Sequence, residues 1–379
     1  MISKRARAVP PSGIRKYFDM ASREKDIVSL GVGEPDFDTP YEIKNKAIES
    51  IELNRTHYTS NAGLLELRER ICKKLKGDNK IDAAPDDVII TSGSSEGLDV
   101  ALRAVLDDGD EVLIPDPAYV AYGPLSQLAG GKPVFVPTSE KNDFRVQVPD
   151  LKKKLTKKTK AILFCSPNNP TGSVLEKEDL KSIAEFAVEN DLVVISDEIY
   201  ERLIYEGEHY SIGSFKGMAE RTITLNGFSK AYASTGWRVG YAVAKGELID
   251  AIYKIHQYCM LCAPTPSQHA MMVAFDQEDI VKEMIKIYDA RRRLLVKGLN
   301  EISGIRCHMP KGAFYAFPNI SGTGLSSEKF TEKLIKEAKV AVVPGCVFGP
   351  SGEGHIRCSY SVSTDTITEA LDRIGKVFN

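Results

Sequence analysis

The stretch Asn226-Gly-Phe-Ser-Lys230, followed by Gly236-Trp-Arg-Val-Gly240, decides how the rest of the chain is interpreted. The apolar run Thr222–Leu225 before it predicts a short strand. A lysine at the end of a buried strand loses hydration, so its pKa falls and its amine becomes nucleophilic toward carbonyl groups. A serine hydroxyl and an arginine guanidinium are groups that bind phosphate. The three side chains together predict a cofactor with an aldehyde and a phosphate, such as pyridoxal phosphate, although most lysines in such loops are simply solvated.

The composition is ordinary for a globular protein and excludes several partners. The chain has 379 residues, 42% hydrophobic and 27% charged, enough for two domains. A net charge of −2 gives no broad positive surface for nucleic acid, and the lysine-rich run Leu151–Lys160 is interpreted as a solvated helix face. No apolar run approaches the roughly 20 residues of a membrane span, and residues 1–13 lack the apolar core of a secretory signal. Seven scattered cysteines favour a reducing compartment, so we expect a cytoplasmic protein.

Two other predicted strands are followed by hydroxyl or aromatic side chains. Asp87–Ile90 precedes Ser94 and Ser95, and a helical pattern begins there. The free N–H groups of a helix N-terminus bind phosphate, although the serines could also serve only as helix caps. Glu111–Ile114 precedes Tyr119, whose ring could stack on a planar ligand or pack in the core.

Two further strands end in polar turns. Ala161–Cys165 precedes Asn169, and Leu192–Ile195 precedes Asp197 and Tyr200. An aspartate at the end of an apolar strand needs a cation or an N–H donor. Strands that alternate with helices predict an α/β fold with a mostly parallel, doubly wound sheet, in which ligands bind at the carboxyl ends of the strands. We therefore expect these strand ends to form one active site.

The pattern changes near residue 280. Residues 312–317 alternate as a strand does, and Arg357 lies in another half-apolar strand, where it needs a carboxylate from a ligand or from an internal salt bridge. We expect a large domain and a smaller α/β domain, divided as an N-terminal segment of the small domain at 1–40, the large domain at 41–279 and the small domain at 280–379.

Two short motifs are weak. Gly31-Val-Gly33 is not a dinucleotide fingerprint, because Pro35 and Asp36 stand where a helix and a third glycine should be. Cys259 and Cys262 form a CxxC motif without a second ligand pair, so we expect packed thiols and no metal.

In combination, the motifs resemble a known family along essentially the whole chain. They are Gly33-Glu-Pro-Asp-Phe37, Ser166-Pro-Asn-Asn-Pro-Thr-Gly172, Ser196-Asp-Glu-Ile-Tyr200, Ser229-Lys230 with Thr235-Gly-Trp-Arg238, Gly312-Ala-Phe-Tyr315 and Ile356-Arg357-Cys-Ser. The chain resembles fold-type I pyridoxal-phosphate-dependent aminotransferases of the aspartate/aromatic branch, and their archaeal and thermophile members most closely.

The resemblance implies a role for each residue around the cofactor. Lys230 carries the cofactor as a Schiff base and then moves the substrate proton. Asp197 pairs with the pyridinium nitrogen, Tyr200 and Asn169 bind the ring O3′, and Tyr119 stacks on the ring. The residues that bind the phosphate are Ser94, Ser95, Ser229, Arg238 and Tyr58 of the neighbouring subunit. This last role implies a homodimer.

The resemblance also implies the reaction, an amino transfer from aspartate or an aromatic amino acid to 2-oxoglutarate by a ping-pong mechanism. Arg357 and Asn169 bind the substrate α-carboxylate, and Gly33 contacts it through its backbone. At one position the sequence departs from the family's site residues, and one substrate contact is left open. Gly227 stands where relatives often carry another phosphate-binding side chain, and Arg15 is only a candidate for a distal carboxylate.

Two other functions use the same motifs. A pyridoxal-phosphate-dependent β-lyase needs the same lysine and aspartate, and differs by releasing pyruvate and ammonia. An effector domain of a transcription regulator would need an added DNA-binding domain, and no helix-turn-helix pattern fits this sequence.

Overall fold

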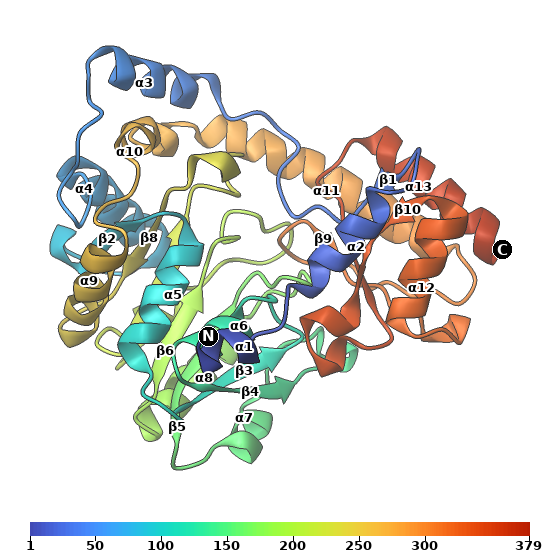
Figure 1. Ribbon diagram of the computed structural model, residues 1–379, viewed down its shortest axis with the longest axis horizontal. Coiled ribbons are helices and arrows are strands. Elements are labelled where there is room, and N and C mark those ends of the chain that lie inside the picture. Colours follow the sequence, from blue (N-terminus) through green and yellow to red (C-terminus); the bar gives the residue numbers. More distant parts are fainter.

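A seven-stranded sheet forms the centre of the larger part of the molecule in the computed structural model, which describes residues 1–379 (Figure 1). The strand order is β2-β8-β7-β6-β5-β3-β4, and only β8 runs antiparallel to its neighbours. The strands are β2 (Val88–Thr91), β3 (Glu111–Asp116), β4 (Lys132–Pro137), β5 (Thr159–Cys165), β6 (Val193–Asp197), β7 (Thr222–Gly227) and β8 (Gly240–Val243). The predicted α/β fold with a mostly parallel sheet is confirmed.

Helices cover both faces of this sheet. Ala161 and Leu163 of β5 pack in one core with α5, whereas Ile162 and Phe164 pack in another core with α8. Alternate side chains of a strand point to opposite faces, so β5 is buried on both sides, as a doubly wound sheet requires. The helices of this part are α3 (Tyr41–Glu52), α4 (Leu65–Lys74), α5 (Ser94–Val105), α6 (Tyr122–Leu128), α7 (Val148–Lys154), α8 (Lys177–Glu189), α9 (Glu247–Cys259) and α10 (Thr265–Met271).

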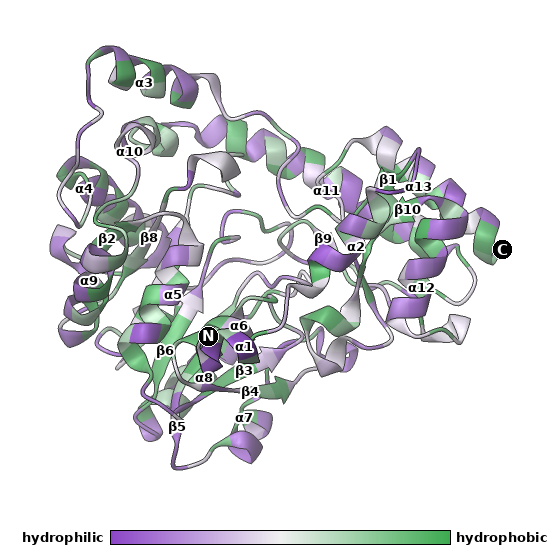
Figure 2. Ribbon diagram, in the orientation of Figure 1, coloured by the Kyte–Doolittle hydropathy of each residue, from purple (hydrophilic) through white to green (hydrophobic).

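The smaller part contains a three-stranded antiparallel sheet and three helices. Its elements are α11 (Glu278–Asn300), β9 (Tyr315–Ala316), α12 (Ser327–Lys333), β10 (Val340–Ala341), β11 (Val343–Pro344), β12 (Ile356–Ser359) and α13 (Thr364–Phe378). Turns of α11 alternate between hydrophilic and hydrophobic residues, as expected for a half-buried helix (Figure 2). No helix is long and apolar enough to cross a membrane.

The N-terminal segment contacts both parts of the molecule. β1 (Val28–Ser29) pairs in parallel with β10 in the smaller part. At the other end, α1 (Lys4–Ala8) lies against α6, and Arg5 forms an ion pair with Asp108 in the turn between α5 and β3. Between them, α2 (Gly13–Ala21) packs near β10. The domain boundaries at residues 40 and 280 stay predictions.

Two local expectations are corrected. The lysine-rich run Leu151–Lys160 is not one helix face, because α7 ends at Lys154 and β5 begins at Thr159. The turn between them is closed by the Thr159 hydroxyl, which accepts a bond from the N–H of Thr156 at 2.9 Å. The alternation at residues 312–317 also gives only a two-residue strand.

Candidate active site

All of the predicted site residues except Tyr58 line one cavity of about 320 Å³. They are Gly33, Ser94, Ser95, Tyr119, Asn169, Asp197, Tyr200, Ser229, Lys230, Arg238 and Arg357. The cavity lies where β2, β3, β5, β6 and β7 end, so the parallel sheet brings together residues that are far apart in the sequence. Tyr58 lies outside it, with 82% of its surface exposed.

Lys230 lies just beyond the end of β7, and its surroundings favour the neutral amine. Burial lowers the pKa of Lys230 to about 8, and the charges of Arg357 and Arg238 act in the same direction, whereas Glu34 opposes them. Its Nζ donates to the carbonyl oxygen of Gly33 at 2.7 Å. This bond holds the amine inside the cavity.

Gly227 is explained by close packing of the backbone. A Cβ at Gly227 would lie 3.0 Å from the Cα of Gly240 and 3.1 Å from the carbonyl oxygen of Val239. A larger residue there would therefore force β7 and β8 apart. The position that could hold another phosphate ligand is instead occupied by the neighbouring strand.

The first turn of α5 forms the part of the cavity suited to an anion. The helix begins at Ser94, and Gly93 is the capping residue, so neither Ser94 nor Ser95 serves as the cap. Arg238 donates to the carbonyl oxygens of Thr235 at 3.0 Å and Ser92 at 3.3 Å, and has no carboxylate partner. A Cβ at Gly93 would meet the Arg238 guanidinium at 2.5 Å. The free N–H groups, the hydroxyls and Arg238 thus face a common space.

Asp197 is a buried carboxylate without a cation in hydrogen-bonding contact. Burial raises the pKa of Asp197 to about 6, whereas hydrogen bonds from Tyr122 and the N–H of Ile199 lower it. The Tyr122 hydroxyl donates to Oδ2 at 2.8 Å, and the ring of Tyr122 packs edge-on against Tyr119. Sequence reasoning missed Tyr122, although its spacing of three residues from Tyr119 at the start of α6 was the available signal.

Arg357 makes no internal salt bridge. It donates to Oδ1 of Asn169 at 3.0 Å and to the carbonyl oxygen of Gly31 at 2.7 Å, while its buried Nε has no partner. Its guanidinium lies 4.4 Å from the ring centre of Tyr315, and the hydroxyl of Tyr315 lies 2.8 Å from that of Tyr200. A guanidinium held in this way favours a carboxylate ligand. Tyr315 was quoted in a motif, but its contacts were not predicted.

The helix α2 closes one side of the cavity with apolar side chains. Ile14 and Phe18 line the cavity. Arg15 points away, with 81% of its side chain exposed, and its Nε lies 3.7 Å from a carboxylate oxygen of Asp19. The helix is fixed to the smaller part by Tyr17, whose hydroxyl donates to Glu328 at 2.7 Å.

Known proteins resemble this chain over its full length. The family described as aminotransferase class I and II matches residues 25–374. An aspartate aminotransferase of Pyrococcus abyssi is 52% identical, over 99% of this chain and 98% of the relative. Aromatic-amino-acid aminotransferase 2 of Thermococcus litoralis is 49% identical, over 99% and 98%. The structure of Thermus thermophilus aspartate aminotransferase with maleate superposes with a TM-score of 0.95, at 37% identity and full coverage of both chains.

Proposed function

The chain belongs to the class I and II aminotransferases, and from this premise we propose that it moves an amino group from an L-amino acid to 2-oxoglutarate by a ping-pong mechanism with pyridoxal phosphate. The observation that carries the proposal is the position of Lys230. Its buried amine, with a pKa of about 8, shares one cavity with Asp197 and Arg357. An amine that is partly neutral near pH 8 can both attack an aldehyde and exchange a proton.

The residues of the cavity fit pyridoxal phosphate. Arg238 and Arg357 are cations without carboxylate partners, whereas Asp197 is a buried carboxylate without a hydrogen-bonded cation. A phosphate near Arg238, a pyridinium nitrogen near Asp197 and a substrate carboxylate near Arg357 would satisfy all three. When bound, pyridoxal phosphate supplies an electron sink for the substrate α-carbon.

Each side chain then has a chemical task. Asp197 holds the proton on the ring nitrogen, which strengthens the electron sink. Asn169 and Tyr200 bind the ring O3′, and Tyr119 covers one ring face. Lys230 would remove the proton from the substrate α-carbon and return it to the carbon that was the aldehyde carbon of the cofactor. The residues that bind the phosphate are Ser94, Ser95, Ser229 and Arg238.

Arg357 orients the substrate. Its two terminal nitrogens donate hydrogen bonds to Asn169 and to the carbonyl oxygen of Gly31. The plane of the guanidinium is therefore fixed before a carboxylate binds. A two-point bond to the α-carboxylate places the Cα–H bond toward Lys230, which reduces the entropy lost in reaching the transition state. The carbonyl oxygen of Gly33 accepts a hydrogen bond from Nζ of Lys230. This contact supports the proposal that the backbone of Gly33 lies beside the substrate α-carboxylate.

We propose that aromatic donors are preferred to aspartate. Ile14 and Phe18 give the substrate side chain an apolar contact, and Arg15 is directed away from the cavity. An apolar wall gains from burial of an aromatic ring but offers no partner to the distal carboxylate of aspartate. The distal carboxylate of 2-oxoglutarate lies one carbon further out, and we expect it to remain hydrated.

We also propose a homodimer in which Tyr58 acts on the neighbouring subunit. Tyr58 is exposed, and two nearby segments carry exposed apolar side chains. One segment is α3 with the residue after it, and the other is the end of α9 with the residues after it: Ile48, Ile51, Leu53, Tyr258, Met260 and Leu261. Asn61 donates to the carbonyl oxygen of Leu261 at 2.7 Å, so the two segments form one surface. Apolar surfaces of this kind mark interfaces.

Subunit mixing tests the dimer. In a heterodimer of Tyr58→Phe and Lys230→Ala chains, one site keeps both wild-type residues only if Tyr58 acts across the interface. We expect one site of each heterodimer to regain the wild-type affinity for pyridoxal phosphate, which is measured as activity at a limiting cofactor concentration. A monomer in analytical ultracentrifugation, or no recovered affinity in a verified heterodimer, would contradict the proposal.

A substrate panel tests the activity itself. Each L-amino acid is first incubated with the holoenzyme alone while the absorption of the bound cofactor is followed, and product formation is then measured after 2-oxoglutarate is added. We expect the cofactor band to shift to that of the aminated form, most rapidly with aromatic donors. Release of pyruvate and ammonia without a new amino acid would instead favour the β-lyase, whereas the relatives described above are all named aminotransferases.

A further inference from the structure

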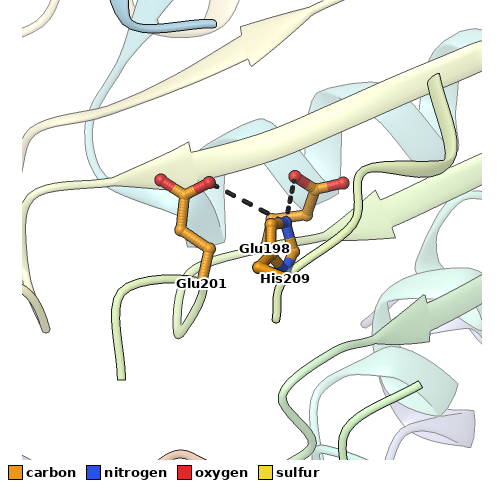
Figure 3. Close-up of side chains that lie close together, drawn as sticks. All are labelled: Glu198, Glu201 and His209. Atoms are coloured by element: carbon orange, nitrogen blue, oxygen red, sulfur yellow. Dashed lines mark hydrogen bonds and ion pairs between the residues drawn. The ribbon is translucent and has the colours of Figure 1, made fainter. Parts of the chain in front are cut away.

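The end of β6 and the turn after it place some side chains in the cavity and others on the side away from it. Asp197 and Tyr200 line the cavity. Glu198 and Glu201 are also buried, but they do not line the cavity and instead form a separate polar cluster with His209 (Figure 3). The reaction proposed above uses neither glutamate.

Glu198 is saturated with hydrogen bonds. Its Oε1 accepts from the hydroxyl of Ser196 at 3.0 Å. Its Oε2 accepts from the hydroxyl of Ser211 at 2.6 Å and from the amide of Asn79 at 3.2 Å, and lies 3.0 Å from Nε2 of His209. Asn79 is 119 residues away from Glu198 in the sequence, whereas the other three partners lie within 13 residues of it.

Glu201 is held in the same way. One carboxylate oxygen pairs with the ammonium group of Lys74, and the other accepts from Asn79 at 2.7 Å. Burial would raise the pKa of Glu201, but the charges of Lys74 and His209 lower it to about 2. Burial lowers the pKa of His209, yet Glu198 and Glu201 raise it overall, against a smaller opposing effect of Lys74. When His209 is protonated, its charge and that of Lys74 balance the charges of the two glutamates.

A metal ion does not suit this cluster. Glu198, Glu201 and His209 have the spacing of metal ligands. However, Lys74 and Asn79 already occupy the oxygens of Glu201, and a divalent cation would have to displace a buried ammonium group.

We propose that Lys74, Asn79, His209 and Ser211 are positioning residues that hold the turn after β6 and thereby fix Asp197 and Tyr200 against the bound cofactor. This inference rests on the proposed function. A buried polar network in which every member is satisfied fixes one backbone arrangement, and residues behind a site restrict the groups that contact the ligand. Glu198 also acts through its charge, which raises the pKa of Asp197, and His209 offsets that charge.

The test compares two buried serines that donate to a glutamate. Ser211→Ala removes the bond to Glu198 and the bond accepted from Asn79, and the control Ser327→Ala removes a 2.7 Å bond to Glu353 in the smaller part. Apparent Kd values for pyridoxal phosphate are measured by fluorescence titration of the cofactor-free dimers, alongside Tm. We expect Ser211→Ala to weaken binding about 5- to 10-fold and Ser327→Ala less than about twofold, at similar losses of Tm.

A conservative variant tests the charge. His209→Gln keeps a donor but removes a positive charge that faces Lys74, Glu198 and Glu201. We expect the midpoint of the pH-dependent absorption of the bound cofactor to rise by about 0.3 pH unit or more, because uncompensated negative charge favours protonated forms.

The outcomes separate the two proposals. If the wild type binds the cofactor but both serine variants bind it equally well, the network is only structural and this inference is wrong. An unchanged absorption midpoint in His209→Gln contradicts the charge role. If the wild-type protein does not bind pyridoxal phosphate, the proposed function fails and this inference fails with it.

Discussion

The depressed pKa of Lys230 should appear as pH-dependent stability of the cofactor-free protein. The ordinary lysine pKa of 10.5 falls to about 8 because the amine is buried. Between these two values the unfolded chain binds a proton that the folded chain does not bind, so stability increases as pH rises. This lowering of the pKa should increase the free energy of unfolding by roughly 3 kcal/mol when the pH rises from below 8 to above 10.5.

A lysine variant isolates this contribution. Lys230→Met removes the titration while keeping an unbranched side chain, and Lys216→Met, at an exposed position, is the control for loss of one lysine. Urea unfolding is measured at several values from pH 7 to 10.5. The difference in the free energy of unfolding between wild type and Lys230→Met should rise by about 2 to 3 kcal/mol across this range. A difference that stays constant within about 0.5 kcal/mol would refute the reasoning, because Lys230 would then titrate as it does in the unfolded chain.

Three other substitutions test the cavity. Arg357→Gln should reduce kcat/KM about 100-fold or more, mainly through KM, with little change in cofactor affinity; equal effects on cofactor binding would contradict its assignment to the substrate carboxylate. Tyr122→Phe removes a donor to Asp197, so the pKa of that carboxyl in the cofactor-free protein should rise beyond about 6, and the acid limb of the affinity for pyridoxal phosphate should move up by about 0.5 to 1 pH unit. Tyr58→Phe should weaken cofactor binding about 10-fold without lowering Tm, as expected for an exposed residue that acts across an interface.

The strand ends could be predicted from the sequence because each side chain follows an apolar run. Parallel strands align their carboxyl ends, so the meeting of Ser94, Tyr119, Asn169, Asp197 and Lys230 followed from the alternation of strands and helices. Local patterns and one rule about sheets were sufficient for this part of the site.

The missed residues depend on contacts between segments that are distant in sequence. Nothing near Tyr315 indicates that it meets Tyr200, and Asn79 gives no sign that it bonds two glutamates more than a hundred positions later. Strand β8 was missed because its residues directly follow the polar loop after Lys230 and run antiparallel to their neighbours.

The N-terminal helix α2 has a clear helical pattern in the sequence. Ile14, Tyr17, Phe18 and Ala21 follow the spacing of one helix face. That pattern leaves Arg15 outside the apolar face, and the structure has it exposed. The contact of this face with the cavity depends on the tertiary fold.

Reduction of the holoenzyme with borohydride, followed by peptide mapping, tests the central claim most directly. The reduced cofactor should be found on the peptide that contains Ser229 and Lys230, as a stable secondary amine on Lys230. Its recovery on another lysine, or the absence of any labelled peptide from protein that has bound pyridoxal phosphate, would contradict the proposed site.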